Sequence, residues 1–133
     1  MAMHMKEKDR KITHFLNVDL DLDVKEGMDE LLDALKPAIV ISGFGTRAGL
    51  ELDLEPESPE NAIMGFVALV QKLPPHIRTI WNEARNKTLS IGIQACPKPH
   101  STEFVLSSHV LSLIQPISVN VAFTVYGVSE EAY

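Results

Sequence analysis

Aliphatic and polar residues alternate strictly near the start of the chain. Every second position from 16 to 24 is aliphatic, and the intervening positions hold Asn17, Asp19, Asp21 and Asp23. A period of two is typical of a strand with one buried and one solvated face. The pattern therefore predicts a strand over residues 12–24 that carries three aspartates along its polar face.

Five further segments have the composition of strands: residues 38–42, 50–55, 88–95, 102–106 and 118–127. Residues 50–55 alternate leucine with Glu51, Asp53 and Glu55. The glycine-rich stretch GFGTRAG lies between the first two segments, so we expect a hairpin whose turn raises Arg47 into solvent.

Apolar residues recur at helical spacing in four other segments: residues 26–37, 58–73, 75–85 and 107–114. Ser58 and Pro59 are typical of a capped helix start, and a pair of prolines separates the second helix from the third. Ser107 or Ser108 caps the last helix. Each helix has one apolar face, as expected for helices that cover a sheet.

The order of these elements is β-α-β-β-α(α)-β-β-α-β. It predicts an α+β fold, a two-layer sandwich in which a mainly antiparallel sheet carries helices on one face. The first six elements match the split β-α-β plan of a ferredoxin-like core, and an extra C-terminal strand-helix-strand follows. We expect residues 1–10 to be a disordered N-terminal segment and residues 11–133 to form a single α+β domain. The predicted core comprises Val18, Leu20, Leu22, Leu31, Leu35, Leu52, Leu54, Phe66, Val70, Ile77, Trp81, Ile91, Ile93, Leu111, Val121 and Phe123.

Composition narrows the classes of partner. The chain has 133 residues, with 12 Lys and Arg against 18 Asp and Glu, for a formal net charge of −6. This charge argues against binding nucleic acid through phosphate neutralisation. No apolar run approaches the roughly 20 residues that span a bilayer, so no membrane partner is expected. Cys96 is the only cysteine and the N-terminus lacks an export signal, which favours a cytoplasmic location.

The acidic residues concentrate on two predicted strands. The first and third strands are neighbours in a ferredoxin-like sheet, so one open face would carry the carboxylates Asp19, Asp21, Asp23, Glu51, Asp53 and Glu55. These six equal the whole excess of acidic over basic residues. Like charges opposite each other destabilise a strand pair and raise one another's pKa values.

Three interpretations of this acidic face compete. It is a solvated face that discourages aggregation, a docking face for a basic protein partner, or a divalent cation site. Calcium takes 6–8 oxygen ligands, usually from a loop with a glycine turn, and no such loop is present. We therefore predict neither a metal nor another cofactor.

No catalytic signature stands out from the sequence. Cys96 and His100 are close in sequence, but no orienting carboxylate accompanies them, and the five histidines lack metal-ligand spacing. We therefore favour a protein that is not an enzyme. Two alternatives remain open: a small enzyme that uses strand carboxylates, for instance Asp21 with Asp53, as acid and base, and a self-association module that forms a homodimer through an edge strand or the polar sheet face.

Landmarks in the C-terminal half point to a family. They are a helix that ends at Leu73–Pro74, a strand over residues 89–95, the Leu106–Ser107 pair that opens a short helix, and a last strand that ends at Tyr126. In these features the C-terminal half resembles small uncharacterised bacterial α+β proteins, recorded as domains of unknown function, some of whose relatives look like toxin-immunity proteins. The resemblance implies a fold and a bacterial cytoplasmic home, and it carries over no active site. The function predicted from the sequence is a non-catalytic protein-binding module whose acidic sheet face receives a basic partner, in the manner of an immunity protein and its toxin.

Overall fold

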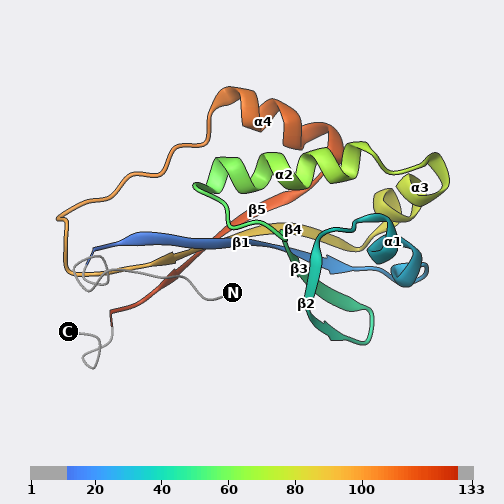
Figure 1. Ribbon diagram of the computed structural model, residues 1–133, viewed down its shortest axis with the longest axis horizontal. Helices are drawn as coiled ribbons and strands as arrows, with labels where there is room; N and C mark the ends of the chain where they lie inside the picture. The colour runs from blue at the N-terminus through green and yellow to red at the C-terminus, as the bar shows by residue number, and fades with distance from the viewer. Residues whose placement is uncertain (1–11, 129–133) are drawn as a thin grey trace.

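The computed structural model describes residues 12–128, which form an α+β fold around one five-stranded sheet (Figure 1). The strands are β1 (His14–Asp23), β2 (Ile39–Phe44), β3 (Arg47–Glu51), β4 (Asn86–Gln94) and β5 (Asn120–Tyr126). They lie in the order β2-β3-β1-β4-β5. Every pair is antiparallel except β4–β5, which is parallel, so the sheet is mixed. The predicted N-terminal segment 1–10 and the ends of the predicted domain 11–133 lie outside the described residues.

The four predicted helices form, and α2 and α4 begin at serine caps that the sequence indicates. They are α1 (Met28–Ala34), α2 (Pro59–Gln71), α3 (Pro75–Glu83) and α4 (Ser108–Ile114), and the 3-10 turn η2 (Gln115–Ile117) follows α4. Ser58 Oγ accepts a hydrogen bond from the Asn61 N–H at 3.0 Å and caps α2. Ser107, rather than Ser108, caps α4, since its Oγ accepts from the Val110 N–H at 3.2 Å. No helix among residues 12–128 is long and apolar enough to cross a membrane.

The core lies between the sheet and the helices. Helices α2 and α4 lie over the same side of the sheet (Figure 1). The aliphatic residues of β1 face that side, and Leu20 is buried whereas Asp21 is exposed, which confirms the predicted register. The largest fully buried side chain is Trp81 of α3, whose Nε1 donates a hydrogen bond to the Ile117 carbonyl oxygen at 2.9 Å. This bond ties α3 to the turn that leads into β5.

The predicted hairpin forms, but its strands are shifted along the chain. The turn consists of Gly45 and Thr46, because Phe44 already pairs with Arg47. Gly45 has a φ of +61°, a left-handed conformation that glycine adopts without strain. Strand β3 therefore starts inside the stretch that predicted the turn, and Arg47 is exposed as expected.

Strand β3 also ends earlier than the alternation predicts. Its last residue, Glu51, pairs with Ile39, the first residue of β2, so no partner on that side continues the ladder. Leu52 instead turns toward α2 and packs over Gly65, where an added Cβ would lie 2.7 Å from Leu52 Cδ1. The expectation that Asp53 and Glu55 extend this strand is therefore wrong. Leu54, predicted to be in the core, is exposed.

The predicted strand over residues 102–106 is also wrong. This segment is irregular and belongs to the crossover that a parallel β4–β5 pair requires. Its Phe104 and Leu106 pack individually against the core, which accounts for their apolar character. Two further residues predicted to be in the core, Leu111 and Phe123, are exposed.

Candidate functional site on the open face of the sheet

The polar residues of β1 lie on the sheet face opposite α2 and α4. The register places Asp21 between Gly49 of β3 and Thr88 of β4. Asp19 is paired with Ser90, and Asp23 lies between Arg47 and Asn86. Side chains of directly paired residues share a face, so the open face combines carboxylates with small and neutral polar residues.

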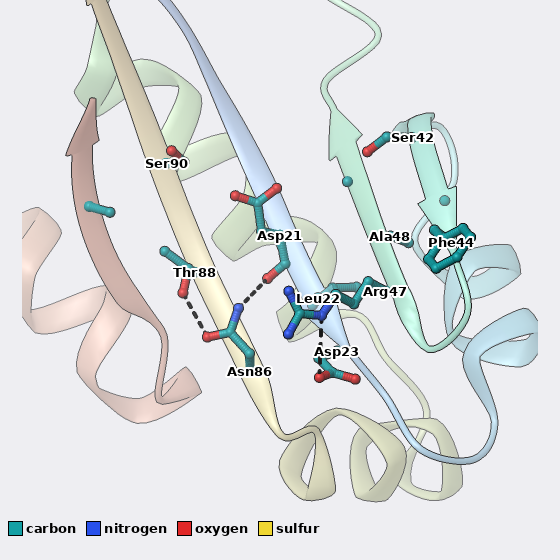
Figure 2. Close-up of a pocket in the computed structure, with 13 residues that line it drawn as sticks. Asp21, Leu22, Asp23, Ser42, Phe44, Arg47, Ala48, Asn86, Thr88 and Ser90 are labelled. Atoms are coloured by element: carbon teal, nitrogen blue, oxygen red, sulfur yellow. Dashed lines mark hydrogen bonds and ion pairs between the residues drawn. The ribbon is translucent and has the colours of Figure 1, made fainter. Parts of the chain in front are cut away.

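A depression of about 600 Å³ occupies this face (Figure 2). Its lining comes from all five strands and includes Asp21, Asp23, Ser42, Phe44, Arg47, Gly49, Asn86, Thr88, Ser90 and Ala122. Gly49 explains part of the hollow, because a Cβ there would lie 2.7 Å from Ser42 Oγ and 3.3 Å from Asp21 Oδ1. The missing side chain leaves the Asp21 carboxyl space above the sheet. At the rim, the Phe44 ring is 90% exposed and offers an apolar contact.

Asp23 at the end of β1 is compensated by cations. Its Oδ1 lies 2.9 Å from Arg85 Nη2, and its Oδ2 lies 3.8 Å from Arg47 Nε. The backbone also fixes this corner, because the Arg85 N–H donates to the Asp23 carbonyl oxygen at 2.7 Å. A hydrogen bond from the Thr46 hydroxyl, followed by the hydrogen bond and charge of Arg85, holds the pKa of Asp23 below its ordinary value.

Asp19 and Asp21 have the opposite environment. Burial, and then the negative charges of Asp21 and Glu51, raises the pKa of Asp19 from 3.8 to about 6. Although Asp21 is exposed by surface area, its place in the middle of the sheet face partly desolvates its carboxyl, and this also raises its pKa. Asn17 Nδ2 donates a hydrogen bond to Asp19 Oδ1 at 3.1 Å. The ion pairs formed within residues 12–128 involve Asp23 and Asp33, not these two carboxyls.

The six predicted site residues therefore divide into three groups. Asp19, Asp21 and Glu51 lie on the open face and form no ion pair with a lysine or arginine of residues 12–128; we call these three the acidic triplet. Asp23 shares this face but is paired with arginines. Asp53 and Glu55 are exposed in the segment between β3 and α2 and do not line the depression.

Several neutral residues of the depression were not among the predicted site residues. Thr88 Oγ1 donates to Asn86 Oδ1 at 2.9 Å, and Asn86 Nδ2 lies 3.4 Å from the Asp21 carbonyl oxygen (Figure 2). The alternation of residues 88–95 already places Thr88 and Ser90 on the polar side of their strand. The missing information was the strand pairing, which sets β4 beside β1.

Other candidate chemistry lies away from this face. Cys96 is buried after β4, whereas His100 is exposed in the following loop. Among the described residues, no group of three or more His, Cys, Asp and Glu side chains is arranged to hold a metal ion.

Comparisons of the chain with protein-family models, curated proteins and solved structures found no match. The likeness to immunity-like bacterial proteins stays a prediction from the sequence.

Proposed function

We propose that this chain is a non-catalytic protein-binding module whose open sheet face receives a basic partner. The observation that carries the proposal is the acidic triplet. Burial already raises the pKa values of Asp19 and Asp21, and no lysine or arginine of the described chain forms an ion pair with either. The free protein therefore carries a repulsion that a cationic group from outside would relieve.

The shape and chemistry of the face favour a protein side chain as that cation. The depression of about 600 Å³ has room for an arginine or lysine side chain beside Asp21. A guanidinium can donate two parallel hydrogen bonds to one carboxylate, and such charge-assisted pairs are strong where water is excluded. Exposed Phe44 at the rim supplies the aromatic contact that protein interfaces favour.

The strand order supports a finer description of the scaffold. Strands β4, β1, β3 and β2 are adjacent in that order, with every pair antiparallel, which agrees with a ferredoxin-like core to which β5 is added. We propose this core as the support of the binding face. The resemblance of the C-terminal half to small bacterial proteins is the basis for two further proposals. We propose a bacterial cytoplasmic setting and an immunity-like role in which the partner is a basic toxin.

A small acid–base enzyme is the second candidate, and the pKa of about 6 for Asp19 favours it, because a general acid works best near the ambient pH. The pair Asp21 and Asp53 proposed from the sequence receives no support, since β3 ends at Glu51 and Asp53 lies outside the sheet that carries Asp21. An enzyme on this face would rely on Asp19 and Asp21. Most side chains that line the depression are polar or charged, whereas small-molecule pockets are lined mainly by apolar side chains, so the lining favours a protein surface over a small substrate.

The test uses two double variants that remove equal charge. Asp19→Asn/Asp21→Asn neutralises the open face, and Asp53→Asn/Glu55→Gln removes the same charge outside the sheet. An arginine-rich peptide serves as a defined probe, and titration followed by backbone amide NMR shifts locates where it binds. We expect shifts at β1, β3 and β4 on the open face, binding about tenfold weaker in the first variant and unchanged in the second, and weakening by salt. Equal binding by both variants would overturn the proposal and leave the acidic triplet as a solvated face.

A further inference from the structure

Strand β5 forms an edge of the sheet along its whole length. Within residues 12–128 it pairs only with β4, at the end of the strand order (Figure 1). Its register with β4 runs without a shift from Asn120 opposite Thr88 to Tyr126 opposite Gln94. The other edge, β2, is interrupted between Val40 and Ser42 by an irregularity of the kind that protects edges from pairing. The structure thus has one regular edge and one irregular edge.

The regular edge lacks the charges that usually protect a free strand. Residues 114–128 contain no Asp, Glu, Lys or Arg, although 23% of the whole chain is charged. Natural proteins commonly place a proline or a charged residue, especially lysine, on an exposed edge to prevent pairing with another chain. Strand β5 has neither a charge nor a proline, which is typical of an edge that is covered by a further strand.

The backbone of β5 presents a regular set of donors and acceptors outward. The Ala95 N–H donates to the Tyr126 carbonyl oxygen at 2.9 Å, so the backbone groups of Tyr126 point toward β4. Backbone direction alternates along a strand, and hence both backbone groups of Val121, Phe123 and Val125 point away from the sheet. An antiparallel strand centred on Phe123 would pair with all of these outward groups.

The side chains of the same residues are apolar and incompletely covered. Phe123 and Val125 pair with Ile91 and Ile93, whose side chains are buried, and therefore lie on the helix-bearing side of the sheet. Phe123 is nevertheless 52% exposed and Val125 is 60% exposed. A strand added beside β5 would place apolar side chains against them.

From these observations we infer that a second copy of this chain pairs with β5, antiparallel and around a two-fold axis at Phe123. In this register Phe123 faces its own copy and Val121 faces Val125 of the other copy, so apolar residues meet on one side. Ala122 faces Thr124 on the other side. The strand is self-complementary, as a two-fold interface requires, and brings no like charges together despite a net charge of −6 per chain.

The proposed dimer has a functional consequence that does not depend on the identity of any partner. A two-fold axis perpendicular to the sheet joins the two sheets into one continuous sheet. Both open faces then lie on the same side, so the two acidic triplets present a bivalent surface. Two linked sites increase avidity for a partner that spans both.

Light scattering during size exclusion tests the dimer, with a mass of twice the 14.7 kDa chain expected at low and high salt alike. Because the interface is apolar, salt should not weaken it, in contrast to the binding of a basic probe. Phe123→Lys places two ammonium groups at the axis and should weaken the dimer about 100-fold. Phe44→Lys makes the same change at the opposite edge of the sheet and should leave the dimer intact.

Two double variants at the same positions test the register independently of folding. Ala122→Lys/Thr124→Glu brings opposite charges together across the axis, whereas Ala122→Lys/Thr124→Lys brings like charges together. We expect the first to dimerise and the second to be monomeric, with circular dichroism showing both folded. A monomeric wild-type chain at the highest soluble concentration, equal dimerisation of both double variants, or loss of the dimer in Phe44→Lys alone would overturn the inference. None of these results bears on peptide binding by a single open face, so the two proposals fail separately.

Discussion

Asp21 and Asp23 lie two positions apart on the same face of β1, yet folding shifts their pKa values in opposite directions. Thr46 and Arg85 lower the pKa of Asp23, whereas burial raises that of Asp21. Strand β1 thus carries one carboxylate at its end that is paired with arginines and one in the middle of the open face that forms no ion pair within residues 12–128. Aspartates that look equivalent in the sequence therefore differ in the structure: the charged form is disfavoured at Asp21 and favoured at Asp23.

Neutralising Asp19 should stabilise the fold at neutral and higher pH. Folding raises the pKa of Asp19 from 3.8 to about 6, so its contribution to stability is fully present below pH 3.8 and is lost as the pH rises through 6. Asp19→Asn should therefore increase the free energy of unfolding by about 1 kcal/mol at pH 8, after allowance for solvent screening. Urea unfolding at pH 4, 6 and 8 measures this.

The matched control for this prediction is Asp53→Asn, which removes the same charge outside the sheet. It should not reproduce the gain at pH 8. An Asp19→Asn variant no more stable than wild type at pH 8 would show that water or counter-ions already relieve the repulsion.

Removing Arg85 should destabilise the protein at neutral pH and not in strong acid. The pKa of Asp23 is lowered in the folded state, so its contribution is present above the unfolded value and is lost as the pH falls through the folded value. Arg85→Gln removes the hydrogen bond of 2.9 Å to Asp23 Oδ1 and should lower Tm at pH 7 more than at pH 3. Lys36→Gln, which breaks the exposed pair with Asp33, should change Tm little at either pH.

Ser107 should contribute more to stability than its neighbour Ser108. Ser107 Oγ caps α4 and also donates at 2.6 Å to Glu60 of α2, so one hydroxyl joins two helix starts. Ser107→Ala should lower the free energy of unfolding by about 1–2 kcal/mol, and Ser108→Ala, in the first turn of the same helix, by much less. Chemical denaturation of both variants compares them, and equal effects would contradict the assignment of the cap.

Replacing Trp81 should be among the most destabilising conservative changes. Trp81→Phe leaves the buried Ile117 carbonyl without its donor at 2.9 Å, opens space in the core and replaces the indole ring near Lys87 Nζ with a smaller phenyl ring. We expect a loss of about 3 kcal/mol, measured by circular dichroism in urea. A loss below about 1 kcal/mol would mean that water replaces the indole N–H.

Local patterns predicted the elements better than the ends of those elements. Ser58 and Pro59 correctly predicted the start of α2, because capping depends on residues that are adjacent in sequence. The end of β3 at Glu51 depends on where β2 starts, and alternation alone carries no information about that partner. For the same reason the alternation predicted Asp53 and Glu55 to be strand residues, although both lie beyond the last residue of β3.

In the candidate site too, the sequence predicted the features that depend on local pattern and missed those that depend on strand pairing. Alternation placed Asp19 and Asp21 on a polar face, and the structure agrees. It did not predict that Arg85, distant in sequence, compensates Asp23, or that Gly49 leaves a hollow beside Asp21. Both features depend on which strands become neighbours, and that is decided by tertiary packing.

The central position of β1 also has a consequence for the newly made chain. Its partner β3 ends at Glu51 and its other partner β4 ends at Gln94, so β1 is synthesised long before the ribosome has delivered both neighbours. During that interval an apolar strand without charges would be prone to aggregate. Three aspartates at alternate positions keep such a segment hydrated and repel identical segments on neighbouring nascent chains. The same charges that repel one another in the folded sheet therefore oppose aggregation of this segment before β3 and β4 are available to pair with it.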